Sequence, residues 1–215
     1  MRQHFDDEIG ALNKEMLKMG LLVEEAVKNG IDSFTSLNTD MAQTVIKGDE
    51  VINRMEHELC DHCAILLAKE QPVASDLRHI VAAIKIVTQL ERIGDHGVHL
   101  AQKAIALEGQ TFIKPLIDLP RMEEIARKML VDSLNAYVEK DSEAAEEIAS
   151  RDKQIDDLYN QVVREILTLI MGDSSKIEQG VELLYVARYL ERFGDHVKNI
   201  CEWVIFSERG EHADL

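Results

Sequence analysis

Apolar residues recur at helical spacing through the first half of the chain. They fall three or four positions apart over residues 6–36, and the same spacing returns over 41–70 and 74–108. This period is that of an amphipathic α-helix whose apolar stripe faces a core. Turn-forming residues separate the first two stretches, and Pro72 ends the second because proline disfavours helical backbone in the residue before it. The pattern predicts three long helices, the third of them central.

The second half repeats this plan. Residues 109–120 hold two of the three prolines and predict a linker. Helical periodicity resumes over 120–140, 143–171 and 175–208, with a Gly-Asp-Ser turn at 172–174. We therefore expect an all-α protein of two tandem homologous three-helix bundles, built from six long antiparallel helices. The first bundle is expected over residues 1–108, the linker over 109–120 and the second bundle over 121–215.

One heptapeptide occurs twice, one hundred residues apart: LERIGDH at 90–96 and LERFGDH at 190–196. Packing of a helix needs only an apolar stripe, so packing alone does not explain why Glu, Arg, Gly, Asp and His recur in register. The recurrence indicates a duplicated domain that has kept one acidic site in both copies.

The motif places two acids one helical turn apart, and the preceding helix of each half carries a second pair at the same spacing. Both pairs of a half lie equally far along the chain from the turn between their helices. An antiparallel hairpin therefore brings them to one height. The expected site comprises four residues in each bundle: Asp49, Asn53, Glu91 and Asp95 in the first, and Asp152, Asp156, Glu191 and Asp195 in the second.

Carboxylates gathered in this way repel one another and raise one another's pKa unless a cation offsets them. Arg92 and Arg192 can provide part of the balance, and a bound metal ion can provide the rest. Oxygen ligands suit Mg²⁺, Ca²⁺, Mn²⁺ or iron better than thiolate-binding zinc. A solvated acidic face without metal is the alternative. Gly94 and Gly194, inside helices, indicate the close approach of a neighbouring helix or ligand.

Four histidines call for an interpretation. His96 and His196 lie beside the acidic face, and we expect structural hydrogen bonds from them, with metal ligation as the alternative. His79 and His99 have no counterpart in the second half, and no role is expected for them.

The chain carries 24 Lys and Arg against 40 Asp and Glu, a formal net charge of −16. This charge repels phosphate backbones, so we expect no direct nucleic-acid binding. No apolar run approaches the ~20 residues that span a bilayer, and the first residues do not resemble a signal peptide. We therefore expect a cytoplasmic protein without membrane insertion. The cysteines predict no disulfide framework, and the Cys60–Cys63 pair is interpreted as buried or half-buried helix residues.

Three features together resemble the PhoU family: the repeated LER-[IF]-GDH, the QPVASDLRHI that precedes its first copy, and Asp-x-x-Ile-Asn/Asp on the preceding helix. The resemblance covers nearly the whole chain. It implies similar three-helix bundles, multinuclear iron or zinc clusters on acidic patches, and a homodimer. It also implies a non-enzymatic, negative regulator of phosphate uptake and phosphate-starvation signalling, which contacts a phosphate ABC transporter and a sensor histidine kinase and associates with the membrane only through its partners.

By this resemblance the metal-ligand positions are the same eight residues. Asn53 departs from the acidic pattern, so we expect the first site to hold a cation more weakly than the second. Two other functions remain open. One is a di-iron carboxylate or ferritin-like protein, although the Glu-x-x-His pairs typical of those sites are absent here. The other is a metal-free helical adaptor.

Overall fold

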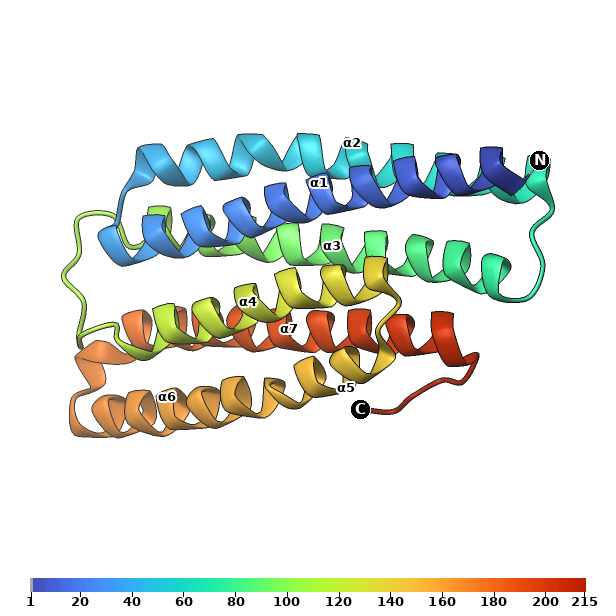
Figure 1. Ribbon diagram of the computed structural model, residues 1–215. Coiled ribbons are helices and arrows are strands. Elements are labelled where there is room, and N and C mark those ends of the chain that lie inside the picture. The colour runs from blue at the N-terminus through green and yellow to red at the C-terminus, as the bar shows by residue number, and fades with distance from the viewer. Residues whose placement is uncertain (1) are drawn as a thin grey trace.

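The computed structural model describes residues 2–215, with side chains from His4 onward, and its regular elements are all helices (Figure 1). No strand occurs among these residues. The first bundle consists of α1 (Arg2–Ser36), α2 (Thr39–Glu70) and α3 (Ser75–Ala106). The second consists of α4 (Asp118–Glu139), α5 (Ser142–Ser150), α6 (Asp152–Gly172), a 3₁₀ turn η1 (Ser174–Lys176) and α7 (Ile177–Arg209). The all-α prediction of two tandem three-helix bundles is confirmed.

Local chemistry explains where several helices begin and end. The Asn38 side chain caps α2 by accepting a hydrogen bond from the Met41 backbone N–H at 3.0 Å. Asp141 caps α5 in the same way. At the other end of α2, Gln71 adopts a left-handed conformation, with φ at 47°, before Pro72. The helix expected over 143–171 is interrupted by a turn at Arg151, which divides it into α5 and α6.

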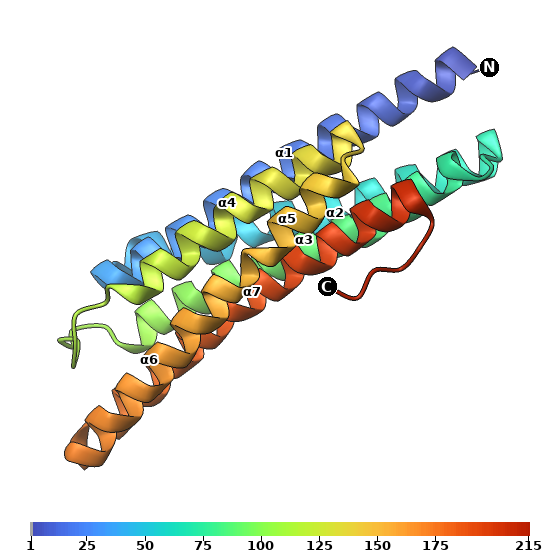
Figure 2. The same cartoon turned by 60° about the horizontal axis from the view of Figure 1, so that its bottom comes forward.

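Each bundle packs around its last helix. α3 contacts α1 and α2, and α7 contacts α4, α5 and α6. The crossing of α1 and α3 is especially close, since a Cβ on Gly97 would lie 2.9 Å from the Ala26 carbonyl oxygen. The bundles meet through two pairs of helices, α3 with α7 and α1 with α4; the second pair is seen side by side in Figure 2. The predicted central position of the third helix is confirmed.

His79 joins four helices at one end of the interface between the bundles. Its ring nitrogens lie 3.3 Å from Ser207 Oγ on α7 and 3.4 Å from Asn13 Oδ1 on α1. The Tyr137 hydroxyl of α4 donates to the His79 carbonyl at 2.9 Å, and the two rings stack at 4.4 Å. The expectation that His79 has no role is therefore wrong: it is a buried polar contact between the bundles.

The two motif histidines meet in the middle of the same interface. The rings of His96 and His196 stack with their centroids 5.3 Å apart. His196 Nδ1 lies 2.8 Å from Gln89 Oε1, which confirms the expected structural hydrogen bond. For His96 that expectation is wrong, because neither ring nitrogen has a hydrogen-bond partner in the part of the chain that the structure describes. His99, given no role above, stacks on Tyr189 at 4.8 Å.

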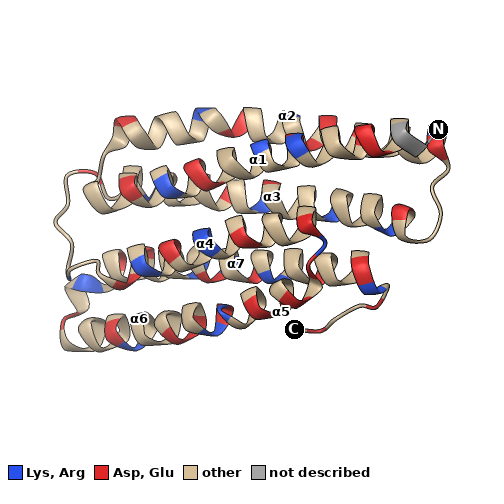
Figure 3. Ribbon diagram, viewed as in Figure 1, with Lys and Arg blue, Asp and Glu red and all other residues tan. Residues whose placement is uncertain are grey.

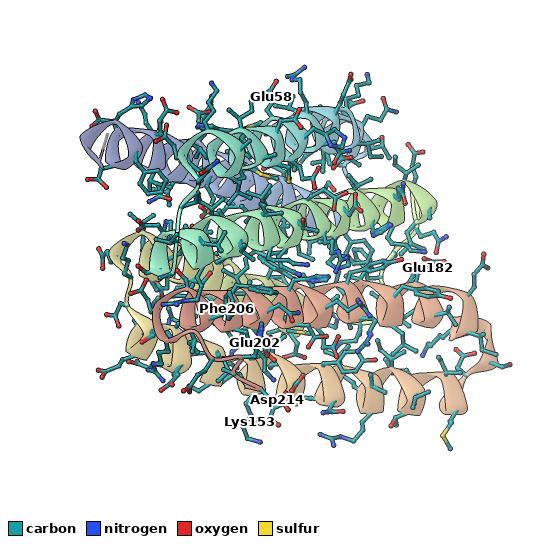
Figure 4. All side chains as sticks on the ribbon, turned by 90° about the vertical axis from the view of Figure 1, so that its right-hand side faces the viewer. Glu58, Lys153, Glu182, Glu202, Phe206 and Asp214 are labelled. Atoms are coloured by element: carbon teal, nitrogen blue, oxygen red, sulfur yellow. The ribbon has the colours of Figure 1, made fainter. Side chains whose placement is uncertain are left out.

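Acidic and basic residues are interspersed along the helices of both bundles (Figure 3). An ion pair of 2.7 Å joins Lys103 of α3 to Glu182 of α7, the latter labelled in Figure 4. Cys63 and Cys201 are buried, Cys60 is half-buried, and all three are free thiols, as expected. Within residues 2–215, none of the helices combines the length and apolar character that crossing a bilayer requires.

Candidate metal-binding clusters

The structure brings the four expected residues of the first bundle together between α2 and α3. Asn53 Nδ2 donates to Asp49 Oδ2 at 2.9 Å on α2, opposite Glu91 and Asp95 on α3. Gly94 is the point where α2 approaches: a Cβ there would lie 3.2 Å from Ile52 Cδ1 and 3.9 Å from Asp49 Oδ1. The motif glycine thus permits close contact with the neighbouring helix, as its position in the sequence indicates.

Partial burial and mutual repulsion act on these carboxylates. Burial raises the pKa of Asp49, and the charge of Asp95 raises it further. Burial likewise raises the pKa of Glu91, with added effects from Asp95, Glu56 and Asp49. The expected upward shift is therefore present, although desolvation contributes more to it than repulsion does.

Glu56 is a member of this cluster that the sequence analysis missed. It lies close enough to Glu91 to raise the pKa of that residue. Its carboxylate is 3.0 Å from His57 Nδ1 and 3.9 Å from Cys60 Sγ. It follows Asn53 by three positions, so helical spacing was the signal that could have identified it. The first cluster, here Asp49, Asn53, Glu56, Glu91 and Asp95, therefore contains four carboxylates despite Asn53.

The second cluster consists of Asp152, Asp156, Glu191 and Asp195, between α6 and α7. Asp152 is only 5% exposed and faces Gly194, where a Cβ would clash with its Oδ1 atom and lie 2.9 Å from Ile155 Cδ1. Burial raises the pKa of Asp152 to about 6, with Asp156 and Asp195 adding to the shift and Lys198 opposing it. Seven of the eight predicted residues are half-buried, as expected of a boundary site, and Asp152 is the exception.

The basic side chain of Arg188 distinguishes the second cluster from the first. Burial and the charge of Asp195 raise the pKa of Glu191, and Arg188 counteracts them through an ion pair with Glu191. The Arg188 guanidinium also lies 6.0 Å from the centre of the Tyr159 ring. The first bundle has Thr88 at the position of Arg188. The first cluster therefore carries its four carboxylates without an equivalent pairing.

Both clusters contain carboxylate oxygens, the donor atoms that hard cations prefer. Four oxygens of these side chains are buried and have no hydrogen-bond partner among the described residues: Asp49 Oδ1, Asn53 Oδ1, Asp152 Oδ1 and Glu191 Oε2. Leaving a buried acceptor unsatisfied costs about 1–3 kcal/mol. Among the described residues, no three His, Cys, Asp or Glu side chains are arranged to hold a metal ion as they stand. The oxygen donors suit a hard or borderline cation, but the carboxylates would have to rotate inward to surround one.

Comparison with known proteins agrees with the duplicated architecture. The family described as PhoU domain matches residues 16–104 and again residues 119–204. A relative from Clostridium acetobutylicum, named phosphate-specific transport system accessory protein PhoU homolog, is 36% identical over 215 residues, covering 100% of this chain and 98% of the relative. A Pseudomonas putida protein of the same name is 37% identical and covers 97% of this chain and 82% of that protein.

Solved structures give the same result. The crystal structure of PhoU from Pseudomonas aeruginosa superposes with a TM-score of 0.90 at 35% identity, covering 96% of this chain and 100% of that one. The phosphate transport system regulatory protein PhoU from Streptococcus pneumoniae gives a TM-score of 0.91 at 34% identity over 98% of this chain and 100% of that one. The two matched domains, the sequence identity and the shared fold show that the chain belongs to the PhoU family.

Proposed function

We propose that this chain is a cytoplasmic, non-enzymatic regulator that restrains phosphate uptake and phosphate-starvation signalling through protein–protein contact. The observation that carries the proposal is the full-length match to relatives named for the phosphate-specific transport system. The expected partners are components of a phosphate ABC transporter and a sensor histidine kinase, and a homodimer is the expected assembly. Contact with the transporter would bring the protein to the membrane without inserting it.

Both acidic clusters are proposed as metal sites within this function. The buried, unpartnered oxygens of Asp49 and Asp152 support the proposal, since a cation would satisfy both. Iron and zinc are the metals implied by the family, while oxygen ligands also accept Mg²⁺, Mn²⁺ or Ca²⁺. A bound ion would neutralise charge and tie α2 to α3 and α6 to α7. It is given no catalytic role.

The added carboxylate of Glu56 changes the expected order of the two sites. Asn53 alone argues for weaker binding at the first cluster, but Glu56 restores the fourth carboxylate. At the second cluster the guanidinium of Arg188, paired with Glu191, competes with a metal ion, whereas Thr88 stands at that position in the first bundle. We therefore propose that the first cluster binds a cation at least as tightly as the second.

The partner contacts are tested by affinity purification of the tagged chain from phosphate-replete and phosphate-starved cells. We expect transporter components and a sensor kinase to copurify, in amounts that change with phosphate supply. Metal content measured on the same samples tests the clusters, with Glu191→Ala/Asp195→Ala as the comparison. Recovery of neither partner under either condition would contradict the proposed contacts. Metal at background level in the wild-type protein would favour a metal-free adaptor.

A further inference from the structure

The second contact between the bundles, along α1 and α4, encloses an unusual charged group. This contact between α1 and α4, called the α1–α4 seam below, is largely apolar. Gly20 of α1 faces Leu134 of α4, and a groove of about 210 Å³ opens beside them. Glu123 of α4 lies at this seam and is only 6% exposed. An ionised carboxylate is costly to bury unless it is well paired, so its partners decide its charge.

Glu123 shares its partner, Arg127, with Glu24 of α1. The Nε atom of Arg127 lies 3.0 Å from Glu123 Oε1, while the Nη1 atom lies 2.9 Å from Glu24 Oε1 on α1. Arg127 Nε and Glu123 Oε1 are buried but do not meet hydrogen-bond geometry. One guanidinium therefore serves two carboxylates from opposite bundles, and the more exposed Glu24 has the better contact.

The charged groups around Glu123 do not offset the effect of burial on its pKa. Burial raises the pKa of Glu123 to about 7, against the opposing effect of Arg127. The charge of Asp32 on α1 contributes to this raised pKa, and the charge of Lys28 on α1 opposes it. The strongest charge effects on Glu123 thus come from α1 and from its own helix, and none of them from α5, α6 or α7.

We propose that the α1–α4 seam is a proton-controlled contact, closed while Glu123 carries a proton and loosened when Glu123 ionises. With Glu123 neutral, Arg127 pairs with Glu24 alone and ties the two bundles together. With Glu123 ionised, a second, poorly hydrated carboxylate is held against the same guanidinium, and separation of α1 from α4 lets water reach it. The α3–α7 contact continues to hold the bundles while the seam loosens.

The direction of the pH effect follows from proton linkage. An open seam returns Glu123 to its ordinary pKa of 4.5, so the open form binds fewer protons than the closed form between pH 4.5 and about 7. The closed seam therefore loses stability as pH rises through this window. Between pH 6 and pH 8 the linkage predicts an increase in seam opening of roughly tenfold.

Amide hydrogen exchange at pH 6 and pH 8, corrected for the intrinsic exchange rate, tests the proposal on the full chain. We expect the protection of peptides covering 17–32 and 123–135 to fall about tenfold at pH 8, while peptides of α3 and α7 change little. Glu123→Gln should abolish the difference and keep the seam protected at both pH values. Glu124→Gln, an exposed neighbour on the same helix, is the matched control and should behave as wild type.

Two results would overturn the proposal. One is a wild-type seam with the same protection at both pH values. The other is a Glu123→Gln protein that retains the wild-type pH response. If Glu123→Gln does not fold, the wild-type protein still decides, through the change in protection between pH 6 and pH 8 in α1 and α4 compared with that in α3 and α7. An equal loss of protection in all four helices would contradict a local opening of the seam. The proposal does not depend on the function proposed above.

Discussion

Gly94 and Gly194 occupy the same place in the repeated motif but meet different neighbours. At Gly94 a Cβ would approach the flexible end of Ile52 at 3.2 Å. At Gly194 it would clash with the buried Asp152 carboxylate and approach Ile155 at 2.9 Å. A methyl group is therefore harder to accommodate in the second bundle, where a charged side chain would also have to move.

We predict that Gly194→Ala destabilises the protein by about 1–3 kcal/mol, the usual cost of overpacking a filled contact. Gly94→Ala should cost clearly less, because alanine gains ~1 kcal/mol of helix propensity over glycine. Gly48, in α2 with nothing within 4 Å of its Cβ position, is the control, and Gly48→Ala should stabilise. Urea unfolding of the three variants measures these differences, and equal free-energy losses at Gly94 and Gly194 would contradict the account.

Glu56 provides a second test at the residue scale. In a Glu191→Ala/Asp195→Ala background, which disables the second cluster, Glu56→Gln should weaken Mn²⁺ binding roughly tenfold, because one of four anionic oxygen ligands is lost. Calorimetric titration of protein stripped with chelator measures the affinity. Glu58→Gln, exposed on the same helix (Figure 4), should leave it unchanged. Equal effects of the two variants would remove Glu56 from the proposed site.

Most of the site was predictable from the sequence because its pairs follow helical spacing on helices that form hairpins. Glu56 was not predicted because it lies three positions from Asn53, whereas the members of each predicted pair lie four positions apart. The depth of Asp152 was also not predictable. Its burial depends on how α6 begins after Arg151 and on the missing Cβ of Gly194, which together bring the carboxylate against α7.

At the scale of helices, apolar periodicity anticipated each long element, since a 3.6-residue period can be read directly from the chain. The interruption at Arg151 was not anticipated, because no proline or glycine marks it. Arg151 instead pairs with Asp132 of α4 at 2.5 Å. Such a contact depends on packing between helices, which a local sequence pattern does not predict.

The junction of α1, α3, α4 and α7 predicts a pH dependence. Burial, with a smaller contribution from the charge of Lys140, lowers the pKa of His79 to about 4. His79 thus stays neutral in the folded protein, whereas the unfolded chain takes up a proton as pH falls through 6.5. Stability present above pH 6.5 is therefore lost as the pH falls toward 4. Between pH 7 and pH 5 the loss is about 2 kcal/mol.

We expect His79→Gln to remove this component, so that the difference in unfolding free energy between wild type and variant shrinks by about 2 kcal/mol on going from pH 7 to pH 5. Chemical denaturation at both pH values is the measurement. His57→Gln is the control, since the His57 side chain is 82% exposed. A difference that does not change with pH would show that His79 is not held neutral at the junction.

At the scale of the whole molecule, the two bundles are held by contacts between residues far apart in sequence. The repeated motif predicts two similar domains, but it does not predict how they face one another. That arrangement depends on the stacking of His96 on His196, on the junction at His79 and on the shared Arg127 at the α1–α4 seam. Each of these contacts joins side chains of different helices, and their separation along the chain follows no periodic pattern that the sequence would reveal.

Restraint of phosphate uptake, the function proposed above, belongs to the whole molecule with its two carboxylate-bearing bundles. The most direct test is the initial rate of radiolabelled phosphate uptake by phosphate-replete cells that lack this protein, with and without the gene restored. We expect faster uptake or an active starvation response in the deletion strain, and a return to the restrained rate on complementation. Uptake and starvation signalling that are the same with and without the protein would contradict it.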